Sequence, residues 1–209
     1  IYVIDAGEII INGNEVDYQG DTNGTAINNA VFIYETDNAK IAKNKFNLDL
    51  VSVPVLWLEI PAGSGNYVPA VVYSEGIVVE DSNMVQFSDN EVNVISGDVV
   101  VGADTIYAVD FKNSDDAVII NNEITSKGNS YIYGLLVSGK DFRITKNVIN
   151  TTGNYYANGI DVEGPASGQI YNNTIVAVAN TSVYPIYGAM SNGNVSVDIV
   201  DNELNGTGF

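Results

Sequence analysis

Cysteine and histidine are both missing from the 209 residues of this chain. Their absence excludes a disulfide framework, Ser-His or Cys-His catalysis, and most sites for transition metals. Basic side chains are also scarce, with 8 Lys and Arg against 26 Asp and Glu, which gives a net charge of −18. A charge this negative argues against nucleic acid as a partner, because phosphate contacts need clustered Lys and Arg.

Long apolar runs are absent as well. No run approaches the roughly 18 residues of a membrane-spanning helix, so we expect no membrane insertion. Charged residues make up only 16% of the chain and hydrophobic residues 45%, which indicates a folded core and not an acidic disordered segment. The chain begins at Ile1 without an initiator Met or a signal peptide, so we interpret it as a mature product or a fragment of a longer repeat protein.

A short motif recurs seven times along the chain. It has an apolar residue, two variable positions, an asparagine, another variable position and a second apolar residue, as in ITKNVI at 144–149. The seven asparagines are Asn14, Asn44, Asn90, Asn122, Asn147, Asn173 and Asn202. Most copies lie 25 to 32 residues apart, which is the length of one three-stranded turn of a parallel β-solenoid. The sequence therefore predicts one all-β domain over 1–209, a solenoid of about seven turns.

The repeated asparagine is predicted to be structural. Equivalent side chains of successive turns lie about 4.8 Å apart, so the amides can hydrogen bond to one another as an inward Asn ladder. Asparagine also tolerates the left-handed backbone conformation, and we expect it to adopt this conformation at a sharp bend. The apolar residues three positions before it and two after it should form two stacked columns.

A second motif, a small residue followed by apolar–x–apolar, lies about 14 residues upstream of most of these asparagines. We expect its small residue to mark another tight corner, because small side chains allow a close turn of the backbone. These residues are Ala30, Gly76, Ala108, Gly134, Gly159 and, in a weakened copy, Gly188.

One interval, between Asn44 and Asn90, is 46 residues long and holds an insertion at 51–73. The insertion contains Trp57, the only tryptophan of the chain, and we interpret it as a loop or hairpin with its tip at 63–66. In one interpretation Trp57 packs back on the solenoid. In the other, the insertion protrudes and binds a ligand or partner.

The repeated Ile-x-x-Asn-x-Ile pattern, with Gly-apolar-x-apolar upstream, resembles right-handed parallel β-helix proteins of the pectin-lyase-like superfamily. The Asn-rich, Tyr-rich and Lys-poor composition is most similar to that of adhesin-like surface proteins of methanogenic archaea. The resemblance covers nearly the whole chain apart from 51–73. It implies a right-handed β-helix that is extracellular, is attached to the cell surface through a parent protein with further repeats, and mediates attachment.

Many pectin-lyase-like proteins cleave polysaccharides, so the resemblance raises the question of catalysis. Those resembling polygalacturonases would need an acidic cluster with His and a basic clamp for the substrate. Those resembling pectate lyases would need carboxylates that bind calcium and an arginine that acts as the base. This chain has no His, and its single arginine, Arg143, lies beside Asp141 as surface charge. These departures argue against an enzyme, and we assign no catalytic residue.

Two aspartates lie at equivalent positions of the second motif. Asp110 and Asp161 occupy the same outward position of the second motif, two turns or about 10 Å apart, whereas inverting glycosidases place their carboxyl groups about 6.5–9.5 Å apart. We interpret the pair as a solvated acidic stripe, with ligand or cation contact and catalysis as alternatives. The other residues of this outward column are apolar and would need a cover. They are Tyr2, Phe32, Val78, Leu136 and Met190.

Tyrosine is abundant, with 13 copies, and Tyr107, Tyr133 and Tyr187 lie just before the second-motif small residue in three different turns. Aromatic faces stack on sugar rings at a low entropic cost, so these side chains could bind a polysaccharide. The alternative is that they pack over corners and stabilise the stack. We expect no cofactor; calcium is possible given the negative charge, but no metal site is assigned.

Together these features lead to the hypothesis of an extracellular, adhesin-like solenoid that binds carbohydrate or a cell-surface partner. A polysaccharide lyase or glycoside hydrolase is the first alternative, and a purely structural spacer is the second. The candidate ligand-binding residues are Tyr107, Tyr133, Tyr187, Asp110, Asp161 and Trp57.

Overall fold

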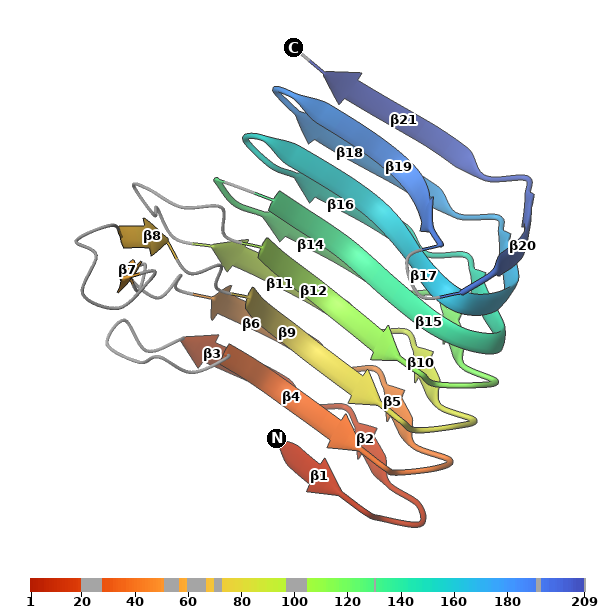
Figure 1. The fold of residues 1–209 in the computed structure, drawn as a ribbon. Coiled ribbons are helices and arrows are strands. Elements are labelled where there is room, and N and C mark those ends of the chain that lie inside the picture. The colour runs from red at the N-terminus through yellow and green to blue at the C-terminus, as the bar shows by residue number, and fades with distance from the viewer. Residues whose placement is uncertain are drawn as a thin grey trace.

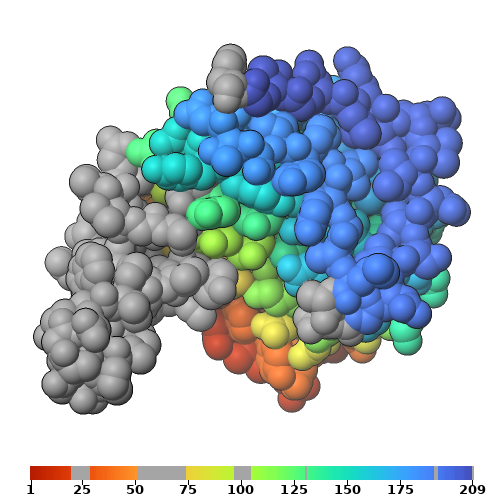
Figure 2. Space-filling model, turned by 45° about the horizontal axis from the view of Figure 1, so that its top comes forward, coloured from red at the N-terminus to blue at the C-terminus, as the bar shows by residue number. Residues whose placement is uncertain are grey.

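The computed structural model describes residues 1–19, 28–50, 57–59, 67–69, 73–96, 105–129, 131–190 and 193–208. Over these residues the chain contains strands and no helix, and it winds as a right-handed parallel β-helix, as predicted (Figure 1). The sequence advances steadily from the N-terminal end to the C-terminal end of the coil, so residues one turn apart lie one above the other (Figure 2).

Each turn supplies three strand segments. The first segments form what we call the front sheet: β1 (Tyr2–Ile4), β4 (Asn28–Tyr34), β9 (Tyr73–Glu80), β12 (Thr105–Lys112), the starts of β15 (Tyr131–Thr145) and β17 (Tyr156–Tyr171), and β19 (Ser182–Ala189). The second segments are β2 (Ile10–Asn12), β5 (Lys40–Ala42), β10 (Gln86–Ser88), β13 (Val118–Ile120), the ends of β15 and β17, and β20 (Val195–Val200). The third segments form a seven-stranded back sheet: β3 (Glu15–Gln19), β6 (Lys45–Leu50), β11 (Glu91–Ser96), β14 (Glu123–Lys127), β16 (Val148–Thr152), β18 (Thr174–Ala179) and β21 (Glu203–Gly208).

The parallel register confirms the two predicted apolar columns. The position three before each asparagine is isoleucine in every turn except one, where Phe87 pairs with Ile41 and Ile119. The position two after it forms a second column on the back sheet, where Ile124 pairs with Val92 and Ile149. In the middle turns these side chains are fully buried. Burial of each contributes about 1.5–3 kcal/mol, so the stacked columns are the main stabilising feature of the coil.

The asparagine ladder is also confirmed. The backbone N–H and Nδ2 of Asn122 both donate to Oδ1 of Asn147, each at 2.9 Å, and Asn147 donates in the same way to Asn173 at 2.9 and 3.0 Å. The other Nδ2 hydrogen of Asn147 reaches the carbonyl of Ile119 in the previous turn at 2.9 Å. The same pattern runs from Asn14 to Asn202. Each inner amide is therefore buried with its hydrogen bonds made.

The predicted backbone conformation of the ladder asparagine is wrong. The residue with positive φ is the one before each asparagine, with φ between 52° and 69°. These residues are Gly13, Lys43, Asp89, Asn121, Lys146, Asn172 and Asp201. The left-handed residue turns the chain, and the asparagine that follows then points its amide inward. Asparagine is required at the ladder position for its side chain and not for its backbone tolerance.

A second ladder lies at the bend between the first and second segments, and the sequence did not reveal it. The Oγ of Ser82 accepts from the backbone N–H of Thr36 at 2.9 Å, and Oγ of Ser138 accepts from that of Asn113 at 2.9 Å. Thr36, Ser82 and Ser114 are completely buried. Short hydroxyl side chains therefore hold the backbone of this bend from turn to turn.

The small residues of the second motif lie inside front-sheet strands and not, as was predicted, at a corner between two strands. The parallel pairing skips one residue at this position, and we call this irregularity the bend of the strand. In β12 the alternation of inward and outward side chains changes phase there, because Ala108 and Val109 both belong to the core. Space is short at this position: a Cβ added to Gly134 would lie 2.7 Å from the carbonyl oxygen of Gly159. The copy assigned to Gly188 is wrong, because Ile186 pairs with Ile160, which places Pro185 at the bend in β19.

Within the 51–73 insertion, β7 (Trp57–Glu59) pairs antiparallel with β8 (Tyr67–Pro69). The proposed tip at 63–66 lies outside the described residues. The side chain of Trp57 is likewise not among those described, so its two interpretations stay predictions.

Candidate binding face on the front sheet

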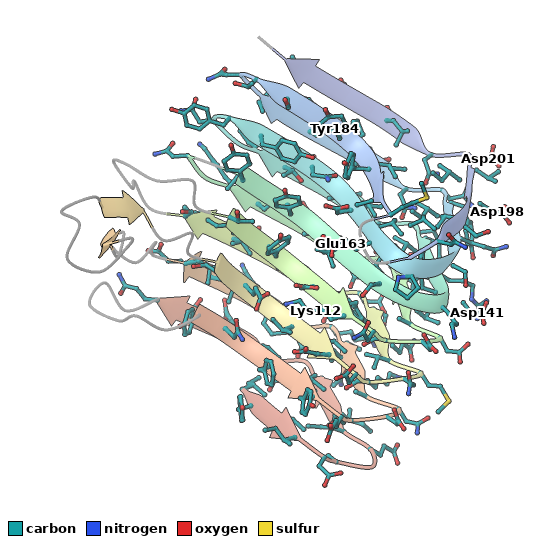
Figure 3. All side chains as sticks on the ribbon, in the orientation of Figure 1. Lys112, Asp141, Glu163, Tyr184, Asp198 and Asp201 are labelled. Atoms are coloured by element: carbon teal, nitrogen blue, oxygen red, sulfur yellow. The ribbon has the colours of Figure 1, made fainter. Side chains whose placement is uncertain are left out.

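The outer face of the front sheet brings the predicted tyrosines and aspartates together (Figure 3). One outward column runs through Tyr107, Tyr133, Asn158 and Tyr184 in four successive turns. A second, three residues further along each strand, is listed here in turn order: Phe32, Val78, Asp110, Leu136, Asp161 and Tyr187. Candidate binding residues from four turns are thus adjacent on one sheet.

The register corrects two assignments. Tyr187 does not share a column with Tyr107 and Tyr133; it pairs with Asp161, and Tyr184 takes the expected place. Met190, assigned to the aspartate column, lies beyond the end of β19. Both errors follow from anchoring the last copy on Gly188. Counting one turn of 26 residues from Asn158 would have found Tyr184.

Asp110 and Asp161 are not a solvated stripe, and that interpretation is wrong. Their exposed fractions are 0% and 5%, and Leu136 lies between them in the column. The two turns between them correspond to about 10 Å of strand spacing. At these two positions an outward side chain is therefore not exposed to solvent.

The Asp110 carboxyl has a cation beside it. Lys112 Nζ lies 3.0 Å from Asp110 Oδ2 and also bonds to Glu75 Oε1. Burial raises the pKa of Asp110 to about 7 against the opposing effect of Lys112, and Glu75 raises it further. Burial lowers the pKa of Lys112, but Asp110 and Glu75 outweigh this effect and the pKa ends above its ordinary value. Lys112 is thus a firmly protonated ammonium between two acids.

The Asp161 carboxyl has a different neighbourhood. Burial raises its pKa to about 7, and the charge of Glu163 adds to this effect. Glu163 follows Asp161 by two residues, as Lys112 follows Asp110, so an acid stands where the other turn has a lysine. Within the described ranges, Asp161 Oδ1 has no hydrogen-bond partner.

Five tyrosine rings cross the turns beside these acids, and we call them the tyrosine chain. Tyr107 stacks on Tyr133 with ring centroids 4.7 Å apart, and the spacings continue at 5.5, 5.4 and 5.3 Å. The chain consists of Tyr107, Tyr133, Tyr156, Tyr184 and Tyr187. Burial is the main cause that raises the pKa of Tyr133 to about 12, with Asp161 second, so its phenol stays a hydrogen-bond donor.

Asn158 lies beneath the tyrosine chain. It is fully buried at the column position between Tyr133 and Tyr184, and the ring of Tyr156 lies 5.5 and 5.4 Å from their rings. Neither atom of its amide has a hydrogen-bond partner in the part of the chain that the structure describes. A buried amide without hydrogen-bond partners destabilises the fold. Such groups are rare in folded proteins, so this one calls for an explanation.

A hollow of about 400 Å³ opens on the same face beside Asp110. Glu163 and Lys112 lie at this face, as Figure 3 shows, whereas Asp141 lies at the bend on the far edge. Arg143 is exposed on the second segment and takes no part in this surface. The lining residues of the hollow are Asn29, Phe32, Glu75, Glu80, Tyr107, Asp110, Lys112, Leu136 and Glu163.

Neither a cluster of metal-binding side chains nor a membrane-spanning helix is found in the described segments. No group of three or more Asp and Glu side chains in the described segments is placed to hold a metal ion. The same segments contain no helix that is long and apolar enough to cross a membrane. In comparisons with known proteins, no family model matches the chain and no curated protein matches its sequence.

Proposed function

We propose that this β-solenoid is a carbohydrate-binding module whose ligand lies across the turns of the front sheet. The observation that carries the proposal is the tyrosine chain, which continues over four turns directly beside two buried carboxyls. Aromatic faces stack on the apolar faces of sugar rings, and carboxylate, amide and phenol groups accept and donate the hydrogen bonds that hydroxyl groups need.

The geometry fits a linear polymer. From β12 to β19 the chain of rings spans about 14 Å at the spacing of parallel strands, which is room for several sugar units. Tyr184 and Tyr187 are 40% and 39% exposed, so part of each side chain is accessible from solvent. The rigid coil holds these rings at fixed spacing, which lowers the entropic cost of binding.

The resemblance to adhesin-like surface proteins of methanogenic archaea extends the proposal. We infer that the module works outside the cell and is carried on the cell surface, where binding to a polysaccharide or another surface partner mediates adhesion. The strongly negative charge of −18 supports a role in an exposed, soluble array.

A screen of the purified chain against a broad glycan array and whole-cell surfaces tests this proposal. We expect binding to a subset of glycans and no release of cleaved products. Absence of binding to every glycan and every cell surface would contradict the proposal and favour the structural spacer.

A glycoside hydrolase is the second candidate, and one observation favours it. Asp110 and Asp161 are buried carboxyls with pKa values raised to about 7, as a general acid requires. Their two-turn separation of about 10 Å is slightly above the range of inverting enzymes. Product release that is abolished by Asp161→Asn would replace the binding proposal with this one.

A further inference from the structure

The rung of Asp110 shows how this face holds an ammonium group. Lys112 Nζ lies 3.0 Å from Asp110 Oδ2 and bonds to Glu75 Oε1, so one cation satisfies two acids across neighbouring turns. The pair is mostly shielded from solvent, since Asp110 is fully buried and the Glu75 side chain is 10% exposed. A desolvated carboxylate gains much more from a nearby cation than an exposed one does.

The turn that contains Asp161 also has two acids, Asp161 and Glu163, but it has no lysine beside them. Glu163 stands two residues after Asp161, where Lys112 stands after Asp110. Asp161 is 5% exposed, and its Oδ1 makes no hydrogen bond within the described segments. The fully buried amide of Asn158 is likewise unpartnered there. Asp161 Oδ1 and the Asn158 amide, on two side chains that are more than nine-tenths buried, thus lie without hydrogen bonds near an additional acid.

Aromatic rings surround this acidic position. Tyr187 pairs with Asp161 in the next turn, and Tyr156 and Tyr184 lie 5.4 Å apart over the adjacent column. An ammonium group near a tyrosine face gains a cation–π attraction in addition to its ion pair. Tyr184 and Tyr187 are partly exposed, so a ligand can reach this part of the face from solvent.

We propose that the Asp161–Glu163 position binds a primary ammonium group of the ligand, and that the ligand is therefore a glycan containing amino sugars with free amino groups. The ammonium would take, on this rung, the place that Lys112 takes on the rung of Asp110. The Asn158 amide, which can both donate and accept, is suited to a neighbouring hydroxyl group. This inference rests on the proposed function and names its substrate class.

The charge of the face argues against the opposite class of glycan. Glu75, Asp110, Asp161 and Glu163 lie at this face, Lys112 is the one cation among the described residues that line the hollow, and the whole chain carries −18. A polymer of uronic acids would bring further carboxylates to this surface and be repelled. A neutral glycan would leave the Asp161–Glu163 position without a cation.

Calorimetric titration of the whole chain tests the inference with three oligosaccharides of equal length. They are a glucosamine oligomer, its fully N-acetylated counterpart and a galacturonate oligomer. At about pH 6.5 and low salt, where the amino groups of the glucosamine oligomer are largely protonated, we expect it to bind at least about tenfold more tightly than the acetylated one, and the galacturonate oligomer not to bind.

Two isosteric variants supply the site control. Asp161→Asn removes one negative charge from the proposed position, whereas Asp141→Asn removes the same charge from an exposed residue at the far edge of the sheet (Figure 3). We expect Asp161→Asn to weaken glucosamine-oligomer binding about tenfold or more and Asp141→Asn to change it less than twofold. Equal losses in both variants would indicate only non-specific charge attraction and overturn the site.

The remaining outcomes separate this inference from the proposed function. Equal affinity for the glucosamine and acetylated oligomers would overturn the ammonium site and leave carbohydrate binding intact. Absence of binding to all three, together with silence on the glycan array, would overturn both. An oligolysine peptide that binds more tightly than the glucosamine oligomer would overturn the assignment to a glycan.

Discussion

Burial raises the pKa of Asp161 well above that of an exposed aspartate, and the stability of the fold therefore depends on pH. Its folded-state pKa of about 7 exceeds the value of 3.8 for the free side chain, so the folded protein holds a proton that the unfolded chain releases. The proton therefore stabilises the fold at low pH, and the contribution is lost as the pH rises from about 4 through about 7. The titratable groups near Asp161 are Glu163, Tyr107, Tyr133, Tyr156 and Tyr187.

The first prediction concerns the variant Asp161→Asn. Because its amide does not ionise, the variant should gain stability relative to the wild type as the pH rises from 4 to 8, by on the order of 2 kcal/mol. Denaturant unfolding of both proteins at several pH values measures this difference, with Asp141→Asn as the matched control. A difference that stays constant over this pH range would contradict the buried, uncompensated carboxyl.

The second prediction compares two asparagines. Asn147→Ala removes a buried amide, leaving the donors of Asn122 and the carbonyl of Ile119 without partners. It should lower the free energy of unfolding by about 3 kcal/mol or more, because each buried orphan costs about 1–3 kcal/mol. Asn154 is exposed and its Oδ1 accepts one bond, from Asn180, so Asn154→Ala should cost less than about 0.5 kcal/mol. Equal melting temperatures for the two variants would refute a stabilising role of the ladder.

At the scale of the strand, the bend in each front-sheet segment depends on the space available next to the backbone. A Cβ on Gly134 would lie 2.7 Å from the carbonyl oxygen of Gly159 and 2.7 Å from Ile149 Cγ2. Gly188 lies on the same sheet, and a Cβ there would meet nothing closer than Val195 Cγ1 at 3.9 Å. The two glycines therefore differ in the space beside them, although the sequence assigned both to the same motif.

The third prediction follows from this difference. Gly134→Ala should destabilise the fold by about 1–3 kcal/mol through overpacking against backbone, whereas Gly188→Ala should be close to neutral. Thermal unfolding of the two variants in parallel is the measurement. A larger loss in Gly188→Ala than in Gly134→Ala would show that the register of β19 described above is wrong.

A fourth prediction concerns the bend before the ladder. Lys146 has φ of 57°, a left-handed conformation that costs a β-branched side chain the most. Lys146→Asn places here the residue type found at the equivalent positions 121 and 172, and it should be neutral or slightly stabilising. Lys146→Val should cost about 1–2 kcal/mol, as measured by denaturant unfolding. Similar stabilities of the two variants would argue against a left-handed residue at this bend.

The sequence predicted the whole coil better than its surface. A ladder asparagine and two apolar columns recur with the period of one turn, so composition and spacing were enough to place Asn147 and Ile149. The hydroxyl ladder of Ser82 and Ser138 was missed, because single serines are common and their spacing carries no distinctive pattern. The burial of Asp161 was missed because the alternation of side chains along one strand does not describe what covers an outward position.

At the scale of the molecule, the coil places side chains from distant segments at constant spacing on one rigid face. The tyrosine chain begins at Tyr107 and ends at Tyr187, yet its neighbouring rings are only 4.7 to 5.5 Å apart. A ligand that crosses the turns can therefore contact all of them without reorganisation of the backbone. This arrangement is the basis of the proposed carbohydrate-binding function.

The measurement that tests this account most directly is the affinity of the best array glycan for the wild type and two tyrosine variants. Tyr156 and Tyr171 lie on the same strand, β17, but only Tyr156 belongs to the tyrosine chain. We predict that Tyr156→Ala weakens binding about tenfold and that Tyr171→Ala leaves it within about twofold. Unchanged affinity in Tyr156→Ala, with its fold intact, would contradict the front sheet as the binding face.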